Sequence, residues 1–151
     1  MCPARMRCFA MSIPDAHPRA ALIVDRARGL IGVPFRAQGR NEAGVDCLGL
    51  VLLAAEAAGV RPVIGAQPLR GLAMRDVSDM LREVGCHELA LVESRAGDVL
   101  ISVPGARQVH LGICTDRGVV EACARIRRVV ERNTIEAGRW RTAWRLPAGD
   151  A

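Results

Sequence analysis

The chain has 151 residues, of which 50% are hydrophobic and 25% are charged, so it can fold around a core and is not a disordered protein. It has no tyrosine, two phenylalanines and two tryptophans, too few aromatic side chains for stacking on nucleic-acid bases. The net charge of +5 would suit an anionic partner, but only Arg125, Arg127 and Arg128 cluster, so we expect no nucleic-acid partner.

The N-terminal segment is typical of a loose tail. Its basic residues are not followed by the apolar stretch of a secretory signal, and no apolar stretch is long enough to span a membrane. We expect a flexible tail over residues 1–15, one domain over residues 16–147, and synthesis in the cytoplasm without a signal peptide. Export would then need another route, such as packaging in a phage-like particle.

The first half of the chain predicts helices. Hydrophobic residues recur at helical spacing over residues 18–31 and again over residues 76–84. Between them, Asp46 is a good N-cap for an apolar helix over residues 48–58, which would end at Gly59.

The second half predicts an antiparallel sheet, because short runs rich in β-branched residues alternate with turn residues. The expected strands are residues 99–103, 109–115, 119–123, 126–130 and 142–146. Asp116, Arg117 and Gly118 would form the tight turn between the second and third of these strands. The predicted fold class is α+β, with the helices preceding the sheet.

One of the six cysteines has an electrostatic reason to react. Cys47 lies at the start of the apolar helix, where unpaired N–H groups and the helix dipole favour a thiolate. The cysteine spacings match no metal-ligand pattern, so we expect no metal site. In a chain without a secretion signal the cysteines are expected to be free thiols, with Cys114 and Cys123 as small core residues.

A base for this thiol is expected at His110, which begins the strand over residues 109–115. If the sheet packs on the Cys47 helix, the imidazole and the sulfur can share a proton as imidazolium and thiolate. The other histidines, His17 and His87, lie outside the expected strands.

Four segments in this order resemble the NlpC-type cell-wall cysteine peptidases, a compact papain-like family. They are residues 31–36 (IGVPFR), 45–50 (VDCLGL), 95–100 (RAGDVL) and 109–113 (VHLGI). With Arg36 and Gln38, the chain looks most like the peptidases encoded in phage-tail and gene-transfer-agent clusters.

The resemblance implies a papain-like NlpC-type fold, with the nucleophile helix packed on the sheet, and hydrolysis of an amide bond in peptidoglycan stem peptides. It implies catalysis by Cys47 and His110 without a metal or organic cofactor, and phage-tail structural proteins as further partners. The substrate-binding residues that it implies are Phe35, where the family usually has tyrosine, Arg36, Gln38 and Asp46. For Asp46, a role as a helix cap alone is the other interpretation.

The family's third catalytic residue, usually a histidine, corresponds to Glu121. A carboxylate can also orient an imidazole and stabilise its cation. However, a two-residue turn at Arg117 and Gly118 would set Glu121 opposite Cys114, about 13 Å along the sheet from His110. Glu121 would therefore need a bulge or a longer turn, and it could instead be an exposed strand residue.

Two other functions fit the same sequence. The fold could carry a related acyl-transferase or amidase chemistry, for which the absent tyrosine leaves room. Alternatively, the domain could be a catalytically inactive structural component of a tail-like particle.

Overall fold

The structure, a computed structural model, describes residues 5–6, 19–61, 69, 71–136 and 138–147. Within these residues the helices are α1 (Ala20–Gly29), α2 (Cys47–Ala57), α3 (Met74–Glu83) and the short 3₁₀ helix η1 (Leu91–Glu93). The α-helices begin and end within two residues of the expected bounds, as hydrophobic periodicity and the Asp46 cap predict.

An antiparallel sheet follows the helices along the chain. In spatial order its strands are β4 (His87–Leu89), β10 (Trp140–Arg145), β5 (Val99–Gly105), β6 (Gln108–Cys114), β7 (Val119–Cys123) and β8 (Arg128–Arg132). Two small pairs flank it, β1 (Arg5–Met6) with β9 (Ile135–Glu136) and β2 (Arg40–Asn41) with β3 (Gly44–Val45).

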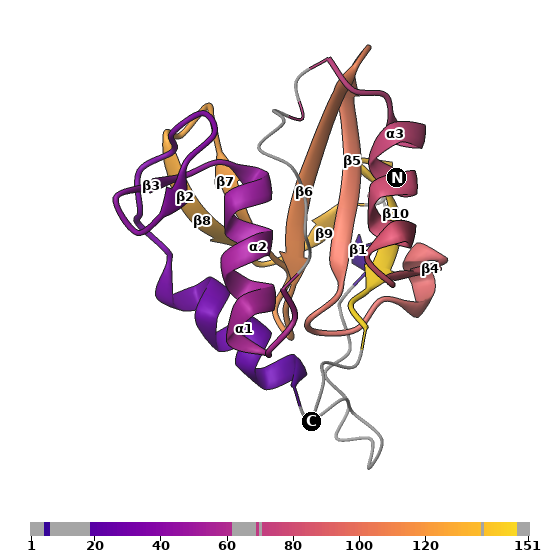
Figure 1. Cartoon of the computed structure of the whole chain (residues 1–151), viewed down its shortest axis with the longest axis horizontal. Coiled ribbons are helices and arrows are strands. Elements are labelled where there is room, and N and C mark those ends of the chain that lie inside the picture. The colour runs from indigo at the N-terminus through magenta and orange to yellow at the C-terminus, as the bar shows by residue number, and fades with distance from the viewer. Residues whose placement is uncertain (1–4, 7–18, 62–68, 70, 137, 148–151) are drawn as a thin grey trace.

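The helices pack on one face of the sheet. Figure 1 shows α2 in front of β6 and β7, and α3 contacts β4 and β6. The main core lies between them and includes Leu50 and Val51 of α2 with Leu111 and Ile113 of β6. A smaller apolar cluster, which includes Trp140, covers the opposite face. The predicted α+β class, with the nucleophile helix packed on an antiparallel sheet, is confirmed.

Two expectations about the sheet are corrected. Strand β8 begins two residues later than predicted, because a turn closed by the Arg127 N–H and the Cys123 carbonyl, 2.7 Å apart, occupies the start of that segment. His87 lies in the sheet after all, because the short edge strand β4 pairs with β10.

The predicted tail and the cysteines are described only in part. Arg5 and Met6 pair with β9, and the remaining residues of the predicted tail lie outside the described residues. Cys47, Cys86 and Cys123 are free, but Cys114 is disulfide-bonded, so the prediction of a free thiol is wrong for Cys114. Among the described residues, no helix is both long and apolar enough to cross a membrane.

Candidate active site

The helix cap at Asp46 fixes the position of Cys47. One carboxylate oxygen of Asp46 accepts the Gly49 N–H at 2.8 Å, and the other accepts the Gln38 N–H at 2.9 Å. Arg40 Nη1 also donates to the first oxygen, at 2.6 Å. Asp46 therefore joins the loop before the helix to the first turn of α2, which begins with the buried Cys47.

Close backbone packing holds the same loop against α2. The Asp46 N–H donates to the Gly39 carbonyl, 3.4 Å away. A Cβ at Gly49 would lie only 2.0 Å from that carbonyl oxygen, so no other residue fits there without moving the loop. The glycine two residues after the nucleophile thus allows the loop to reach the helix N-terminus.

The predicted substrate-binding residues Phe35, Arg36 and Gln38 lie on the segment that pairs with the two residues before Cys47. Phe35 forms an isolated bridge with Val45 and packs partly buried against the core. The Arg36 N–H donates to the Val45 carbonyl at 3.0 Å, and the side chains of Arg36 and Gln38 are exposed. The Asp46 carboxylate is engaged by three protein donors, which favours its role as a cap.

His110 lies near Cys47, as the sequence predicts. Its imidazole is close enough to the Cys47 thiol for the two groups to interact, and its Nε2 lies 3.6 Å from Oε1 of Glu121, an ion-pair distance. Burial lowers the pKa of His110, but the contacts with Cys47 and Glu121 outweigh burial and raise this pKa to about 9. The imidazole is therefore held in its cationic form at neutral pH.

The predicted separation of Glu121 from His110 is wrong, because the turn before β7 is longer than expected. Strands β6 and β7 pair at Ile113 with Val120 and at Cys114 with Val119, which leaves four residues in the turn. Continued one step, this register sets Glu121 opposite Gly112, diagonal to His110 on the same face. A diagonal neighbour is within reach of a glutamate side chain.

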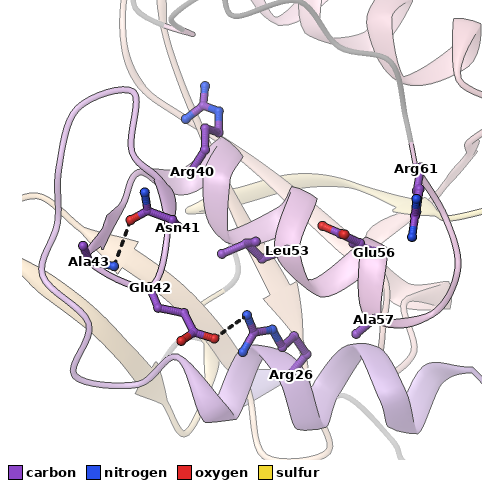
Figure 2. Close-up of a pocket in the computed structure, with 9 residues that line it drawn as sticks. All are labelled: Arg26, Arg40, Asn41, Glu42, Ala43, Leu53, Glu56, Ala57 and Arg61. Atoms are coloured by element: carbon purple, nitrogen blue, oxygen red, sulfur yellow. Dashed lines mark hydrogen bonds and ion pairs between the residues drawn. The ribbon is translucent and has the colours of Figure 1, made fainter.

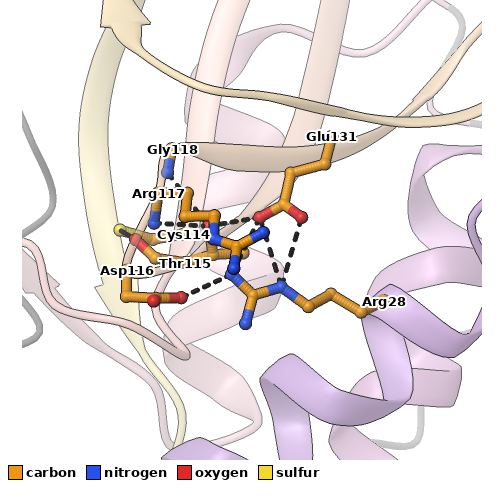
Figure 3. A network of polar contacts seen from close by, with 7 residues as sticks. All are labelled: Arg28, Cys114, Thr115, Asp116, Arg117, Gly118 and Glu131. Carbon is orange, nitrogen blue, oxygen red and sulfur yellow. Dashed lines mark hydrogen bonds and ion pairs between the residues drawn. The ribbon is translucent and has the colours of Figure 1, made fainter.

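A network of polar contacts, centred on Thr115, holds this longer turn (Figure 3). The Thr115 hydroxyl accepts N–H groups from Arg117 and Gly118, at 3.1 and 3.0 Å, and donates to Glu131 on β8 at 2.8 Å. Glu131 also accepts from Arg28 of α1, which pairs with Asp116 as well. These residues connect the turn, β8 and the first helix.

Glu121 is buried among cations. Its side chain is 1% exposed, and its Oε1 lies 2.7 Å from Arg139 Nη2 and 3.5 Å from Arg132 Nε. Burial alone would raise the pKa of Glu121. The contacts with His110 and Arg139 outweigh burial and lower this pKa from its ordinary value of 4.5 to about 2. Sequence reasoning missed both arginines, because each comes from a different strand region and no local motif marks them.

Trp140 is another neighbour of His110 that the sequence reasoning missed. The two rings lie 5.8 Å apart, centroid to centroid, and are tilted by 31°. A Cβ at Gly112 would lie 2.9 Å from the Trp140 ring and 2.5 Å from Val119, so glycine makes room for the indole. The glycine in the VHLGI segment is the one sequence signal that pointed to such a close neighbour.

A pocket of about 820 Å³ lies away from these residues (Figure 2). It lies between α1, the β2–β3 hairpin and the second half of α2, and an ion pair of Arg26 with Glu42 crosses part of it. None of Cys47, His110 and Glu121 lines it, although Arg40, which lines it, binds Asp46.

The sequence matches no family model and no curated protein. Its structure is nevertheless similar to solved NlpC/p60 domains. The peptidoglycan hydrolase RipB of Mycobacterium tuberculosis matches with a TM-score of 0.62 and 21% identity, over 93% of this chain and 70% of RipB. The P60 domain of an antigen from M. avium subspecies paratuberculosis matches with a TM-score of 0.62 and 20% identity, over 85% of this chain and 94% of that domain.

A third similar structure is RipD of M. tuberculosis, described as a non-catalytic NlpC/p60 domain protein adapted to peptidoglycan binding. It matches with a TM-score of 0.57 and 19% identity, over 85% of this chain and 98% of RipD. A peptidoglycan hydrolase and a non-catalytic protein therefore share this architecture. What these comparisons show for the present chain is the NlpC/p60 fold.

Proposed function

We propose that residues 16–147 form a cysteine peptidase that hydrolyses an amide bond in peptidoglycan stem peptides. The observation that carries this proposal is the position of His110, which interacts with the Cys47 thiol and pairs with the buried Glu121 carboxylate. A nucleophile, a base and a group that orients the base are the three parts that covalent acyl transfer requires. The fold shared with a peptidoglycan hydrolase supports the substrate class.

In the proposed mechanism, the Cys47 thiolate attacks the amide carbonyl carbon. The N–H groups of Cys47 and Leu48 have no acceptor among the described residues, and they are available to the oxyanion. The His110 imidazolium then gives its proton to the leaving nitrogen, the C–N bond breaks, and a thioester remains. Water attacks the thioester, neutral His110 accepts its proton, and the thiolate leaves, which restores the ion pair.

The substrate-binding residues that the family resemblance implies extend this proposal. Phe35, Arg36 and Gln38 lie on the segment that Asp46 joins to the nucleophile helix, so a stem peptide bound along this segment would pass Cys47. Exposed Arg36 and Gln38 side chains can bind its carboxylate and amide groups. We propose that Asp46 serves the substrate indirectly, by holding this segment.

Release of soluble stem-peptide fragments from purified peptidoglycan tests the proposal. We expect fragments from the wild type and from Cys86→Ala, and none from Cys47→Ala. Cys86 is a matched control because it is a free, buried thiol whose pKa burial raises to about 11. At pH 7 iodoacetamide should therefore alkylate Cys47 much faster than Cys86.

The same experiments decide between the alternatives. RipD makes a non-catalytic role the second candidate, because it has this fold and is described as non-catalytic. That role predicts no released fragments and no faster alkylation of Cys47 than of Cys86. Fast alkylation without fragment release would instead favour an acyl-transferase or amidase.

We further propose that the protein is made in the cytoplasm and delivered to the wall in a phage-tail-like particle, where it contacts tail structural proteins. The sequence resemblance to tail-encoded peptidases supports this proposal. The disulfide at Cys114 fits work outside the cytoplasm, because such bonds persist in oxidising compartments. Mass spectrometry of purified particles tests it, and absence of the protein from them would contradict it.

A further inference from the structure

Arg139 connects the two side chains that flank the proposed base. Its Nη2 donates to Glu121 Oε1 at 2.7 Å, and its guanidinium carbon lies 5.1 Å from the centroid of the Trp140 ring. Trp140 contacts the His110 ring, and His110 Nε2 lies 3.6 Å from the same Glu121 oxygen. Arg139, Glu121, His110 and Trp140 therefore form a closed ring of contacts.

The sheet fixes two members of this ring. Trp140 pairs with Ser102 across β10 and β5, and Ser102 pairs with His110 across β5 and β6. The three residues thus lie in one row across three strands, and Trp140 is almost fully buried. Arg139 is different, because it lies just before β10 and its side chain is 33% exposed. Its position depends on the two contacts that it makes.

The charges around Glu121 give Arg139 a role in the reaction cycle. Glu121 faces His110 from β6, Arg132 from β8 and Arg139 from the segment before β10. A buried carboxylate is costly unless a cation or donor accompanies it. His110 ceases to be a cation once it has given its proton to the leaving group, whereas an arginine stays charged. The closest fixed charge to Glu121 is that of Arg139.

We propose that Arg139 is a positioning residue for His110 that acts through Glu121 and Trp140. It keeps the Glu121 carboxylate ionised while His110 is neutral, and its planar guanidinium holds the indole that packs on the imidazole. Arg139 touches neither the nucleophile nor, in the proposed mechanism, the reacting atoms. This inference rests on the proposed function, but its test needs no peptidoglycan.

The test is the pH dependence of Cys47 alkylation by iodoacetamide in the full chain, for Arg139→Gln and for the matched control Arg141→Gln. Arg141 is an exposed arginine on β10, and its replacement changes the net charge equally. Without Arg139, Glu121 takes up a proton at higher pH, and the imidazolium then loses its anionic partner. We expect the acidic limb of the rate profile to move up by about one pH unit in Arg139→Gln and to stay in place in Arg141→Gln.

The conservative variant Arg139→Lys separates charge from shape. Its ammonium keeps the ion pair with Glu121 but lacks the planar face that stacks on Trp140, so the limb should move less than half as far. The inference is overturned if Arg139→Gln folds and the acidic limb of its rate profile superimposes on that of Arg141→Gln. If Arg139→Gln does not fold, identical limbs for Arg139→Lys and Arg141→Lys would overturn it instead.

Fragment release tests the peptidase activity, and the position of the acidic limb tests the role of Arg139, so the two can fail separately. If the wild type releases no stem-peptide fragments but the Arg139→Gln limb still moves, the peptidase proposal fails and the positioning role stands. If the wild type hydrolyses peptidoglycan and the limb does not move, the peptidase proposal stands and Arg139 is only a surface residue.

Discussion

Two glutamates on neighbouring strands, Glu121 on β7 and Glu131 on β8, both bind arginine, but they do different work. Glu131 contacts Arg28 and Thr115, which keep the same charge across the physiological pH range. Glu121 contacts His110, whose raised pKa of about 9 still allows it to lose its charge above neutral pH or when it gives up its proton. An ion pair can take part in proton transfer only when one of its partners titrates. Glu131 holds the turn, whereas Glu121 can respond to the proton on the base.

The largest expected difference between the two sites is in catalysis. Glu121→Gln should lower kcat for stem-peptide release by about 10²–10⁴-fold, because the imidazolium loses its anionic partner. Glu131→Gln should leave kcat within about threefold, because the Glu131 carboxylate bonds to Arg28 and Thr115 rather than to the proposed catalytic pair. Steady-state kinetics on peptidoglycan, with a thermal melt to show that each variant folds, measures both. Equal losses of kcat in the two folded variants would remove the distinction.

The two sites should also differ in how stability depends on pH. The folded-state pKa of His110, about 9, exceeds its ordinary value of 6.5. Its stabilising contribution is therefore fully present below pH 6.5 and lost as the pH rises through 9. The pKa values of Glu121 and Glu131 are lowered, so their contributions are present above the ordinary value of 4.5 and lost only in acid.

Urea unfolding at pH 6 and pH 9.5 checks this difference. We expect the wild type to lose up to about 3 kcal/mol of unfolding free energy between these values, and His110→Gln to lose much less. Glu131→Gln should keep the wild-type alkaline loss. An alkaline loss that persists unchanged in His110→Gln would show that another group causes it.

A third experiment tests whether the turn network is purely structural. Thr115→Val removes the hydroxyl that accepts two N–H groups and donates to Glu131, and it should cost about 1–3 kcal/mol of stability. Thr115→Ser keeps the hydroxyl and serves as the control. Denaturant unfolding measures the stability, and kcat per folded molecule should stay near the wild-type value. A large loss of kcat in folded Thr115→Val would mean that the turn also tunes the site.

The smallest effect is expected at the exposed end of the network. Arg28→Lys keeps the charge but loses the paired donors to Glu131, and the ion pairs there are partly exposed. We expect less than about 1 kcal/mol of destabilisation and no change in kcat, measured by urea unfolding and peptidoglycan kinetics. A larger loss than that of Thr115→Val would place Arg28, rather than Thr115, at the centre of the network.

Local patterns predicted the elements but not all of their pairing. The Asp46 cap and the apolar run after it predict α2, because both signals lie within one helix. The sequence predicts a turn after Cys114 that is shorter than the turn in the structure. The Thr115 hydroxyl holds the longer turn by bonding to Glu131, 16 residues further along the chain, and no local pattern reveals that bond. The sequence identifies Glu121 as a candidate site residue, but the predicted turn length places it far from His110.

The residues around the base were harder to predict for the same reason. Arg132, Arg139 and Trp140 reach Glu121 or His110 only through strand pairing, and isolated arginines in a basic chain carry no signal. The two-residue strands β2, β3 and β9 are also too short for any periodicity to reveal. In contrast, Cys47, His110 and Gly49 lie in short sequence motifs, so the residues beside them in the chain indicate where they lie in the fold.

The short ladder between β6 and β7 has a mechanical consequence. These strands pair at two positions, whereas β7 and β8 pair at five, so this junction has fewer backbone bonds to resist bending. His110 lies on one side of it and Glu121 on the other. The contact between His110 and Glu121 therefore also joins two strands where their backbone pairing is shortest, and we expect it to limit how far they bend against each other.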